Sequence, residues 1–286
     1  MQSIGPFQVS IIKHQVLTQY FRWFQVYERP VNERRYLNQL EILSDEVIIE
    51  SAAGTSSGKT QLKERLDKFE GWLNAHHVNK TVIEVLDDGT FSLEADILYQ
   101  NIRPDKSRFS YTIHYSAVLN NMEKELPVFK SLKIKPTGEG DATVFEDTYN
   151  ENRAKAFMHY WCYCLESSHC DSIKFKELLA EDFILELSEG RVAHNFDEFD
   201  TWLASTRNKI IQSAHDPKNF TVTVNKDNSI SVKVDFDWQG MNNNNEAMHA
   251  ETRHEWLLIN DMDERFARLK HMKVIQLQLF SVINSK

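Results

Sequence analysis

The sequence predicts an α+β protein made of two tandem domains, each with three helices packed on the concave face of a mostly antiparallel sheet. Two observations predict this fold class. The same order of segments occurs twice along the 286 residues, and in each copy helical patterns precede four long, alternating segments. Sheets duplicated in this way can pair face to face, so we expect the two domains to form an internal pseudo-dimer.

The two copies match at a nearly constant spacing. "LSDEVIIES" at Leu43–Ser51 resembles "LAEDFILELS" at Leu179–Ser188, an offset of 136 residues. The offset changes only through the loops, which is typical of a tandem duplication. Other matched pairs, at offsets of 136 to 140, are Tyr27 with Tyr163, Asp96 with Asp235, Tyr99 with Trp238, and His114 with His254.

Each copy begins with helical segments, whose apolar residues recur every three or four positions. In the first copy the predicted helices are Val16–Tyr27, Glu33–Leu43 and Thr60–Ala75, and in the second they are Arg153–Glu166, Ser172–Ala180 and Phe196–Ala214.

A short strand precedes the third helix of each copy, and four longer strands follow that helix. The first copy's strands are Val47–Ser51, Thr81–Leu86, Phe91–Gln100, Phe109–Leu119 and Val128–Lys135. The second copy's strands are Phe183–Leu187, Phe220–Asn225, Ile230–Gln239, Ala247–Ile259 and Phe266–Phe280. "DDG" at 87–89 and "KDN" at 226–228 are predicted hairpin turns.

An acidic, non-periodic stretch at Pro136–Asn152 has the composition of a linker. We therefore expect a first domain at 1–138, a linker at 139–152 and a second domain at 153–286.

The stretch "SAAGTSSGKT", Ser51–Thr60, superficially resembles a phosphate-binding loop. Such a loop needs glycine, four residues and then Gly-Lys-Ser/Thr, but Gly54 stands only three residues before Gly58. The second copy has "LSEGRVAHNF" here, without Gly-Lys-Thr. We predict a turn that leads into a helix, with Ser57 or Thr60 as its N-cap, and no nucleotide as partner.

The charge and composition of the chain argue against further classes of partner. The formal net charge is −9, and without a basic cluster such a chain favours neither nucleic acid nor an anionic membrane. The N-terminal segment lacks the pattern of a secretion signal, and no apolar run is long enough to span a bilayer. The sequence thus predicts a cytoplasmic protein with reduced cysteines at Cys162, Cys164 and Cys170. Their spacing does not predict a metal site, and no cofactor is expected.

Several short motifs resemble a known superfamily. "AHDPKNFTV" places His215 shortly before Asn219, "AHHVNKTVIEV" places His76 and His77 before Asn79, and Tyr27-Glu28 follows an aromatic helix. In this pattern and in the order of its segments, nearly the whole chain resembles two copies of the nuclear transport factor 2-like superfamily. The resemblance is to its SnoaL-like branch, which includes polyketide cyclases, ketosteroid isomerase and scytalone dehydratase.

The resemblance implies a cone-shaped, mostly apolar pocket in which a few polar groups transfer protons. His76, His77 and Tyr27 are the catalytic candidates, and the two histidines are expected at the end of the third helix. The predicted ligand-binding residues are Trp23, Phe24 and Tyr99 in the first copy and Tyr160, Tyr163, His215 and Trp238 in the second.

A second polar set is predicted on the outer face of the sheets. Asp96 and His114 fall in the polar half of alternating strands, so they point away from the apolar helices. With their matched partners Asp235 and His254 they are expected to hold the two sheets together, although a catalytic role is the alternative.

The sequence therefore favours binding of a small, largely apolar molecule in one or both cones, with isomerase, dehydratase or cyclase-type proton transfer. The alternative is a non-catalytic binding or protein-interaction module. We expect the first cone to be the functional one, because Cys164 takes the place of the acid Glu28 in the second copy.

Overall fold

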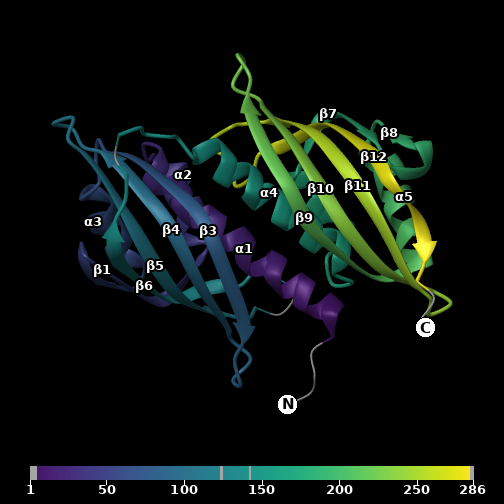
Figure 1. Ribbon diagram of the computed structural model, residues 1–286, viewed down its shortest axis with the longest axis horizontal. Helices are drawn as coiled ribbons and strands as arrows, with labels where there is room; N and C mark the ends of the chain where they lie inside the picture. The colour runs from purple at the N-terminus through teal and green to yellow at the C-terminus, as the bar shows by residue number, and fades with distance from the viewer. Residues whose placement is uncertain (1–4, 123–124, 142, 284–286) are drawn as a thin grey trace. The chain divides into compact units, whose positions relative to one another are not determined.

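The computed structural model describes residues 5–122, 125–141 and 143–283 (Figure 1). Their contacts divide them into two compact units. Residues 15–156 form the first unit, and residues 5–14 together with 157–283 form the second. The predicted linker at 139–152 includes position 142, which lies outside the described residues. The pairing of the two domains as a pseudo-dimer stays a prediction.

The first unit contains one six-stranded sheet in the order β2-β1-β6-β5-β4-β3. Strands β1 and β6 are parallel, and all other neighbours are antiparallel. The strands are β1 (Leu43–Ser51), β2 (Gly54–Ser57), β3 (Leu73–Val85), β4 (Phe91–Ile102), β5 (Arg108–Asn120) and β6 (Val128–Glu139).

The second unit repeats this topology in the order β8-β7-β12-β11-β10-β9, with a parallel pair between β7 and β12. Figure 1 shows its four long strands side by side, in green to yellow. The strands are β7 (Leu179–Glu186), β8 (Val192–Ala193), β9 (Ile210–Val224), β10 (Ile230–Asn242), β11 (Ala247–Ile259) and β12 (Arg268–Val282). The predicted α+β class and the tandem duplication are confirmed.

Helices cover one face of each sheet. The α-helices are α1 (Pro6–Glu28), α2 (Glu33–Leu40), α3 (Leu62–Asp67), α4 (Tyr149–Glu166) and α5 (Phe196–Lys209), and the 3₁₀ helices are η1 (Lys59–Gln61), η2 (Ser172–Glu177) and η3 (Ser188–Gly190). Asn195 caps α5 by accepting from the backbone N–H of Glu198, whose side chain in turn accepts from the N–H of His194. None of the helices in the described part of the chain has the length and apolarity needed to cross a membrane.

Aromatic contacts fasten the first helix of each copy to its sheet. Tyr20 and Phe24 of α1 are fully buried, and their ring centroids lie 5.8 and 6.0 Å from that of Tyr115 on β5. In the second unit, Phe157 of α4 lies 5.5 Å from Trp256 of β11. Burial of each such side chain contributes about 1.5–3 kcal/mol, so these contacts fix the helices on the sheets.

The third helices are shorter than predicted, and this changes the placement of three histidines. Helix α3 ends at Asp67, and β3 already begins at Leu73, so His76 and His77 lie on a strand rather than at a helix end. Gly71 adopts a φ of 75°, a left-handed conformation that ends the helical turn. Helix α5 likewise ends at Lys209, because the β-branched Ile210-Ile211 begins β9, which carries His215.

The stretch Ser51–Thr60 forms a β-hairpin rather than a simple turn. Gly54–Ser57 pairs with β1, and Gly58 follows it with a φ of 79°. The predicted N-cap role of Ser57 or Thr60 is wrong, since neither η1 nor α3 has a side-chain cap. Ser57 is held in the hairpin instead, where its backbone N–H donates to Gln61 at 2.7 Å.

We expect no specific heat when ATP or GTP with magnesium is titrated into the protein. The Lys59 ammonium, which a phosphate would need, lies 2.9 Å from the Asp45 carboxylate, and the hairpin does not offer the helix N-terminus of a phosphate-binding loop. Isothermal titration measures this directly. A micromolar affinity that disappears in Lys59→Ala would contradict it.

Candidate active site

The first unit contains a cavity of about 440 Å³ that is partly open to solvent. Helices α1 and α3 border it together with the inward face of β3, β4 and β5. Its volume is typical of small-molecule pockets, which span roughly 300–1,000 Å³. Its walls combine many aromatic rings with smaller apolar side chains and several polar groups. The lining residues are Trp23, Tyr27, Ser51, Ala52, Ala53, Arg65, Phe69, Trp72, Asn74, His76, Tyr99, Asn101, Arg103, Tyr111, Ile113, Tyr115, Ile134 and Pro136.

His76 faces this cavity from β3. It is paired directly with Tyr99 of β4, and directly paired residues of antiparallel strands share one face. Its Nδ1 lies 3.0 Å from Oε1 of Glu28. Because Nδ1 donates to that carboxylate, Nε2 carries the ring's lone pair. Within the described residues Nε2 has no hydrogen-bond partner, so it is the nitrogen left for a molecule in the cavity.

Glu28, the last residue of α1, is the anchor of this histidine. Its side chain is fully buried. Besides the ring of His76, its Oε1 accepts from the His76 backbone N–H at 3.1 Å, from the Thr148 hydroxyl at 2.8 Å and from the Asn152 amide at 2.8 Å. A carboxylate at a helix C-terminus is disfavoured by the helix dipole, and these four donors offset that cost. The result is a rigidly oriented His76 ring.

Aromatic rings hold His76 from two sides. Phe24 stacks on it with ring centroids 4.5 Å apart, and Tyr99 lies 5.0 Å away. Trp23 and Tyr99 line the cavity, as the sequence predicts, but Phe24 does not, because it lies behind the His76 ring. His77 faces the opposite side of the sheet, where its Nε2 lies 3.2 Å from Gln100 Oε1. Adjacent strand residues must diverge in this way, so only one of the two candidate histidines reaches the cavity.

A polar group of two side chains lies at the cavity wall beside Tyr27. The Arg65 Nε donates to the Tyr27 hydroxyl at 3.2 Å, and an Nη of Arg65 donates to Ser51 at 3.0 Å. Burial raises the pKa of Tyr27, an effect that Arg65 partly opposes, so the hydroxyl keeps its proton at neutral pH. With Arg65 as its donor, Tyr27 can direct its own O–H toward a ligand oxygen.

A second hydrogen-bonded pair lies next to His76. Tyr99 donates its hydroxyl to Asn74 Oδ1 at 2.7 Å, and Asn74 Nδ2 donates to the backbone carbonyl of Tyr27 at 2.6 Å. The amide of Asn74 therefore ties the end of α1 to the two strands that carry His76 and Tyr99.

The second unit encloses a cavity of about 400 Å³ with an equivalent histidine. His215 of β9 pairs with Trp238 of β10, and both line the cavity. Its Nδ1 and its backbone N–H lie 3.1 and 2.6 Å from Oε1 of Glu166, the last residue of α4. His14 Nε2 lies 3.4 Å from the same oxygen. Burial alone would raise the pKa of Glu166, but the charge of His14 and hydrogen bonds from His14 and His215 lower it to about 2.

The acid of the second copy is thus Glu166, and the prediction that Cys164 replaces it is wrong. Both first helices end at this glutamate, which aligns Glu28 with Glu166 at an offset of 138 rather than 136. In the corrected alignment Trp161 and Leu165 line the second cavity in place of Trp23 and Tyr27. The three cysteines of this region are buried free thiols.

Tyr160 and Tyr163, predicted as ligand-binding residues, do not line the second cavity. Tyr160 donates its hydroxyl to Glu177 at 2.9 Å, and its ring stacks on Phe266 and Tyr163. Because the sequence alignment of the two copies was wrong by two residues, it predicted the wrong face of α4 to line the cavity. Since Leu165 occupies the position of Tyr27, the second cavity lacks that hydroxyl.

His254 is the clearest correction among the predicted outer-face residues. It pairs with Val234, lines the second cavity and is 8% exposed. Arg253 faces outward instead and forms an ion pair with Asp235, with Nε 2.7 Å from Oδ1. The true match of His114 is therefore Arg253, at an offset of 139. Burial, and repulsion from His215, lower the pKa of His254 to about 3, so its ring is neutral inside the cavity.

His114 and Asp96 lie on the outer face of the first sheet, as alternation predicts. The ring nitrogens of His114 lie 2.7 Å from Asp96 and 2.8 Å from Glu94. The hydrogen bond that His114 donates to Asp96 raises the pKa of His114, assisted by Glu94 and opposed by slight burial. A role of these residues in joining the two domains stays a prediction.

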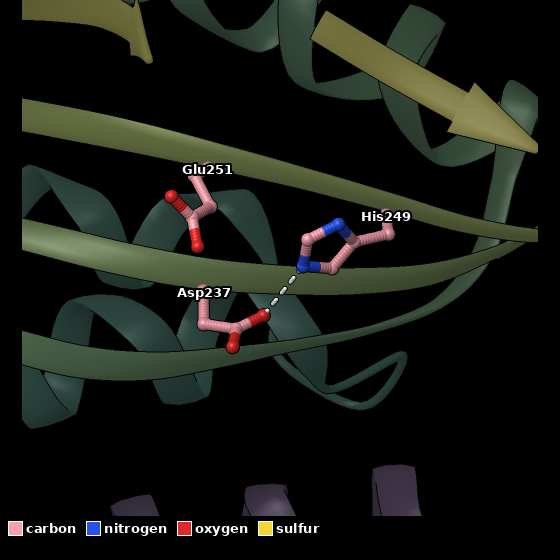
Figure 2. Close-up of side chains that lie close together, drawn as sticks. All are labelled: Asp237, His249 and Glu251. Atoms are coloured by element: carbon pink, nitrogen blue, oxygen red, sulfur yellow. Dashed lines mark hydrogen bonds and ion pairs between the residues drawn. The ribbon is translucent and has the colours of Figure 1, made fainter. Parts of the chain in front are cut away.

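A group of metal-type ligands also lies on the outer face of the second sheet (Figure 2). Potential ligand atoms of Asp237, His249 and Glu251 lie within 4.8 Å of one another. His249 Nε2 lies 2.9 Å from Asp237, and the Lys218 ammonium lies 2.8 Å from the other Asp237 oxygen. The hydrogen bond from Lys218 lowers the pKa of Asp237 despite partial burial. The Asp237 carboxylate is thus already paired with His249 and Lys218, and we assign this group no metal.

Four polar residues of the two sites were missed by sequence reasoning: Arg65, His14, Asn74 and Glu166. Arg65 looks like a solvated helix residue, His14 precedes the aromatic part of its helix, and Asn74 follows the unrecognised end of α3. A usable signal did exist for Glu166, because a glutamate ends the aromatic helix in both copies.

No family model and no curated protein matches the chain. Solved structures do match parts of the chain. ActVI-ORFA from Streptomyces coelicolor is 14% identical with a TM-score of 0.37, over 44% of this chain and 97% of that one. Hexachlorocyclohexane dehydrochlorinase LinA-type3 from Novosphingobium barchaimii is 10% identical with a TM-score of 0.39, over 47% and 92%. A type 2 LinA is 5% identical with a TM-score of 0.42, over 48% and 90%. Each match spans about one half of this chain.

Proposed function

We propose that the first unit binds a small, largely apolar molecule in its cavity and that His76 accepts a proton from that molecule. One observation carries the proposal: the buried Glu28 carboxylate holds His76 Nδ1 at 3.0 Å, which leaves Nε2 as the base on the cavity side. An imidazole oriented by a carboxylate is suited to general base catalysis near neutral pH.

The other polar groups of the cavity suit the same chemistry. Removal of a proton from carbon leaves negative charge, usually on an oxygen conjugated to that carbon. Arg65 and the protonated hydroxyl of Tyr27 can stabilise such an oxygen, since both are donors held in place before a ligand arrives. The aromatic walls suit the apolar part of the molecule. This is the pattern of isomerase, dehydratase or cyclase-type proton transfer.

The second cavity supports a related but different assignment. It combines the oriented base His215 with the neutral ring of His254, and it lacks the hydroxyl of Tyr27. We infer that it binds a small apolar molecule as well. A neutral imidazole there can donate a hydrogen bond to a ligand oxygen.

A non-catalytic binding or interaction module is the competing function, and the other hydrogen bonds of Glu28 favour it. Glu28 also accepts the His76 backbone N–H and the side chains of Thr148 and Asn152, so it would be needed for folding even without chemistry. Only an experiment that measures proton transfer separates the two functions.

We expect the protein to catalyse the ring opening of 5-nitrobenzisoxazole, a small aromatic probe that requires a single proton abstraction. His76 Nε2 takes the C3 proton, the C–H electron pair forms the nitrile, the N–O bond breaks and its electrons leave on the phenolate oxygen. Absorbance of the nitrophenolate measures the rate. His76→Phe should lower the catalysed rate about 100-fold, the lower range for an aligned general base.

His77→Phe is the matched control, because His77 neighbours His76 on the opposite face of the same strand. It should keep at least half of the wild-type rate, and His215→Phe reports any contribution of the second cavity. Equal rates in wild type and His76→Phe would contradict proton transfer by His76 and favour the non-catalytic module.

A further inference from the structure

Arg65 is a buried cation that has no anionic partner in the part of the chain that the structure describes. The residue is 3% exposed, and among the described residues its guanidinium donates to two neutral oxygens, those of Tyr27 and Ser51. No carboxylate within the described residues forms an ion pair with it. Burial of an unpaired charge is costly, so such an arginine is normally found where it meets an anion. Further N–H groups of the fork stay available toward the cavity that Arg65 lines.

The rest of the cavity has the same electrostatic character. A second guanidinium, that of Arg103, lines it and lies over the rings of Trp72 and Phe109, 4.7 and 3.9 Å from their centroids. Among the described lining residues there is neither an aspartate nor a glutamate. The chain as a whole carries a net charge of −9, so this cavity has the opposite sign to the protein that surrounds it.

We propose that the first cavity selects an aromatic or similarly apolar ligand that bears a carboxylate, and that Arg65 binds this carboxylate. Bidentate contact between a planar guanidinium and a carboxylate satisfies both groups, and the Tyr27 hydroxyl can donate to the same anion. The aromatic walls, including Trp23, Phe69 and Trp72, accommodate the apolar body. The proposal rests on the proposed function for the cavity's role in binding, and it adds the chemical class of the ligand.

The test compares trans-cinnamate with trans-cinnamamide, which share a shape and differ in charge. Isothermal titration of the full-length protein at neutral pH measures both affinities. Cinnamate should bind wild type at least tenfold more tightly than the amide. In Arg65→Gln this ratio should fall to about one, whereas Arg65→Lys, which keeps the charge but not the fork, should retain a reduced preference.

Two further variants keep the result interpretable. Arg108→Gln removes an exposed arginine of β5 that donates to the carbonyl of Thr143, and it should leave the ratio unchanged. Arg103→Gln should lower the ratio without disturbing the contacts of Tyr27 and Ser51. A ratio near one in wild type, a ratio unaffected by Arg65→Gln, or no binding of either compound would overturn the proposal.

His76→Phe separates this inference from the proposed function. It should keep the cinnamate preference, because Arg65 is intact, while it loses turnover of the benzisoxazole. If turnover is absent but the preference depends on Arg65, the anion site stands and the catalytic proposal falls. If turnover depends on His76 but no preference is seen, the catalytic proposal stands and the anion site falls.

Discussion

Glu28→Ala is expected to lower the free energy of unfolding of the first unit by about 3–5 kcal/mol. The substitution leaves three buried donors without their acceptor: the ring N–H of His76, the Thr148 hydroxyl and one N–H of the Asn152 amide. The His76 backbone N–H loses Glu28 as well but keeps the Thr148 oxygen at 2.8 Å. Each unsatisfied group costs about 1–3 kcal/mol, less where a neighbour or water can relax toward it. The loss should appear as a lower urea midpoint and as faster amide hydrogen exchange across Leu73–Val85.

Glu84→Ala supplies the control, because Glu84 is an exposed glutamate of β3, the strand that carries His76. It should change stability by no more than about 0.5 kcal/mol. Glu28→Gln retains an oxygen acceptor and should fall between the two. If Glu28→Ala behaves like Glu84→Ala, the hydrogen bonds to Glu28 do not hold the first unit together.

The second unit is expected to lose stability as the pH falls from 6.5 toward 3, because of His254. Its pKa in the folded state is about 3, since burial and repulsion from His215 disfavour the charged ring. The unfolded chain takes up this proton near pH 6.5, so below that pH the unfolded state binds more protons and is favoured. Stability is full above the unfolded pKa and is lost as the pH falls toward the folded pKa. At pH 5 the loss amounts to about 2 kcal/mol.

Between pH 7 and pH 5, the free energy of unfolding of wild type should therefore fall by about 2 kcal/mol more than that of His254→Phe. Urea unfolding at the two pH values measures it, and exposed His169 provides a control as His169→Phe. The Glu166 carboxyl, with a pKa of about 2, contributes stability that is lost only below about pH 4.5, so the two effects occupy different windows. An identical pH dependence in wild type and His254→Phe would refute the assignment of a neutral, buried ring.

The sequence predicts the architecture well because strands and turns are recognisable from short segments, and each pattern occurs in both copies. Alternation along β4 places Asp96 on the outer face, and the tight turns at 87–89 and 226–228 connect the strands as predicted. The ends of the third helices were missed. "FEGWLNAHH" continues a helical pattern in sequence, while Gly71 and the pairing of β3 with β4 end it in space.

The candidate site was only partly predictable, because a strand's register decides which side chains enter a cavity. A shift of one residue reverses every side chain of a strand, and an offset of 140 instead of 139 was enough to place His254 outside. Arg65 could not be found in this way at all. Its burial depends on a cavity formed by segments that are distant in the chain, and nothing in its local sequence distinguishes it from a surface arginine.

The assignment of residues 5–14 to the second unit has a consequence for synthesis of the chain. His14 is fully buried, and its Nε2 meets the carbonyl of His215, a residue 201 positions later. At ribosomal rates of 5–20 residues per second, roughly 10–40 s pass between the two. Throughout this interval the start of α1 has been made, but the last of these His14 partners has not. Residues 5–14 must therefore wait for much of the later sequence, and the second unit cannot be completed from residues 157–283 alone.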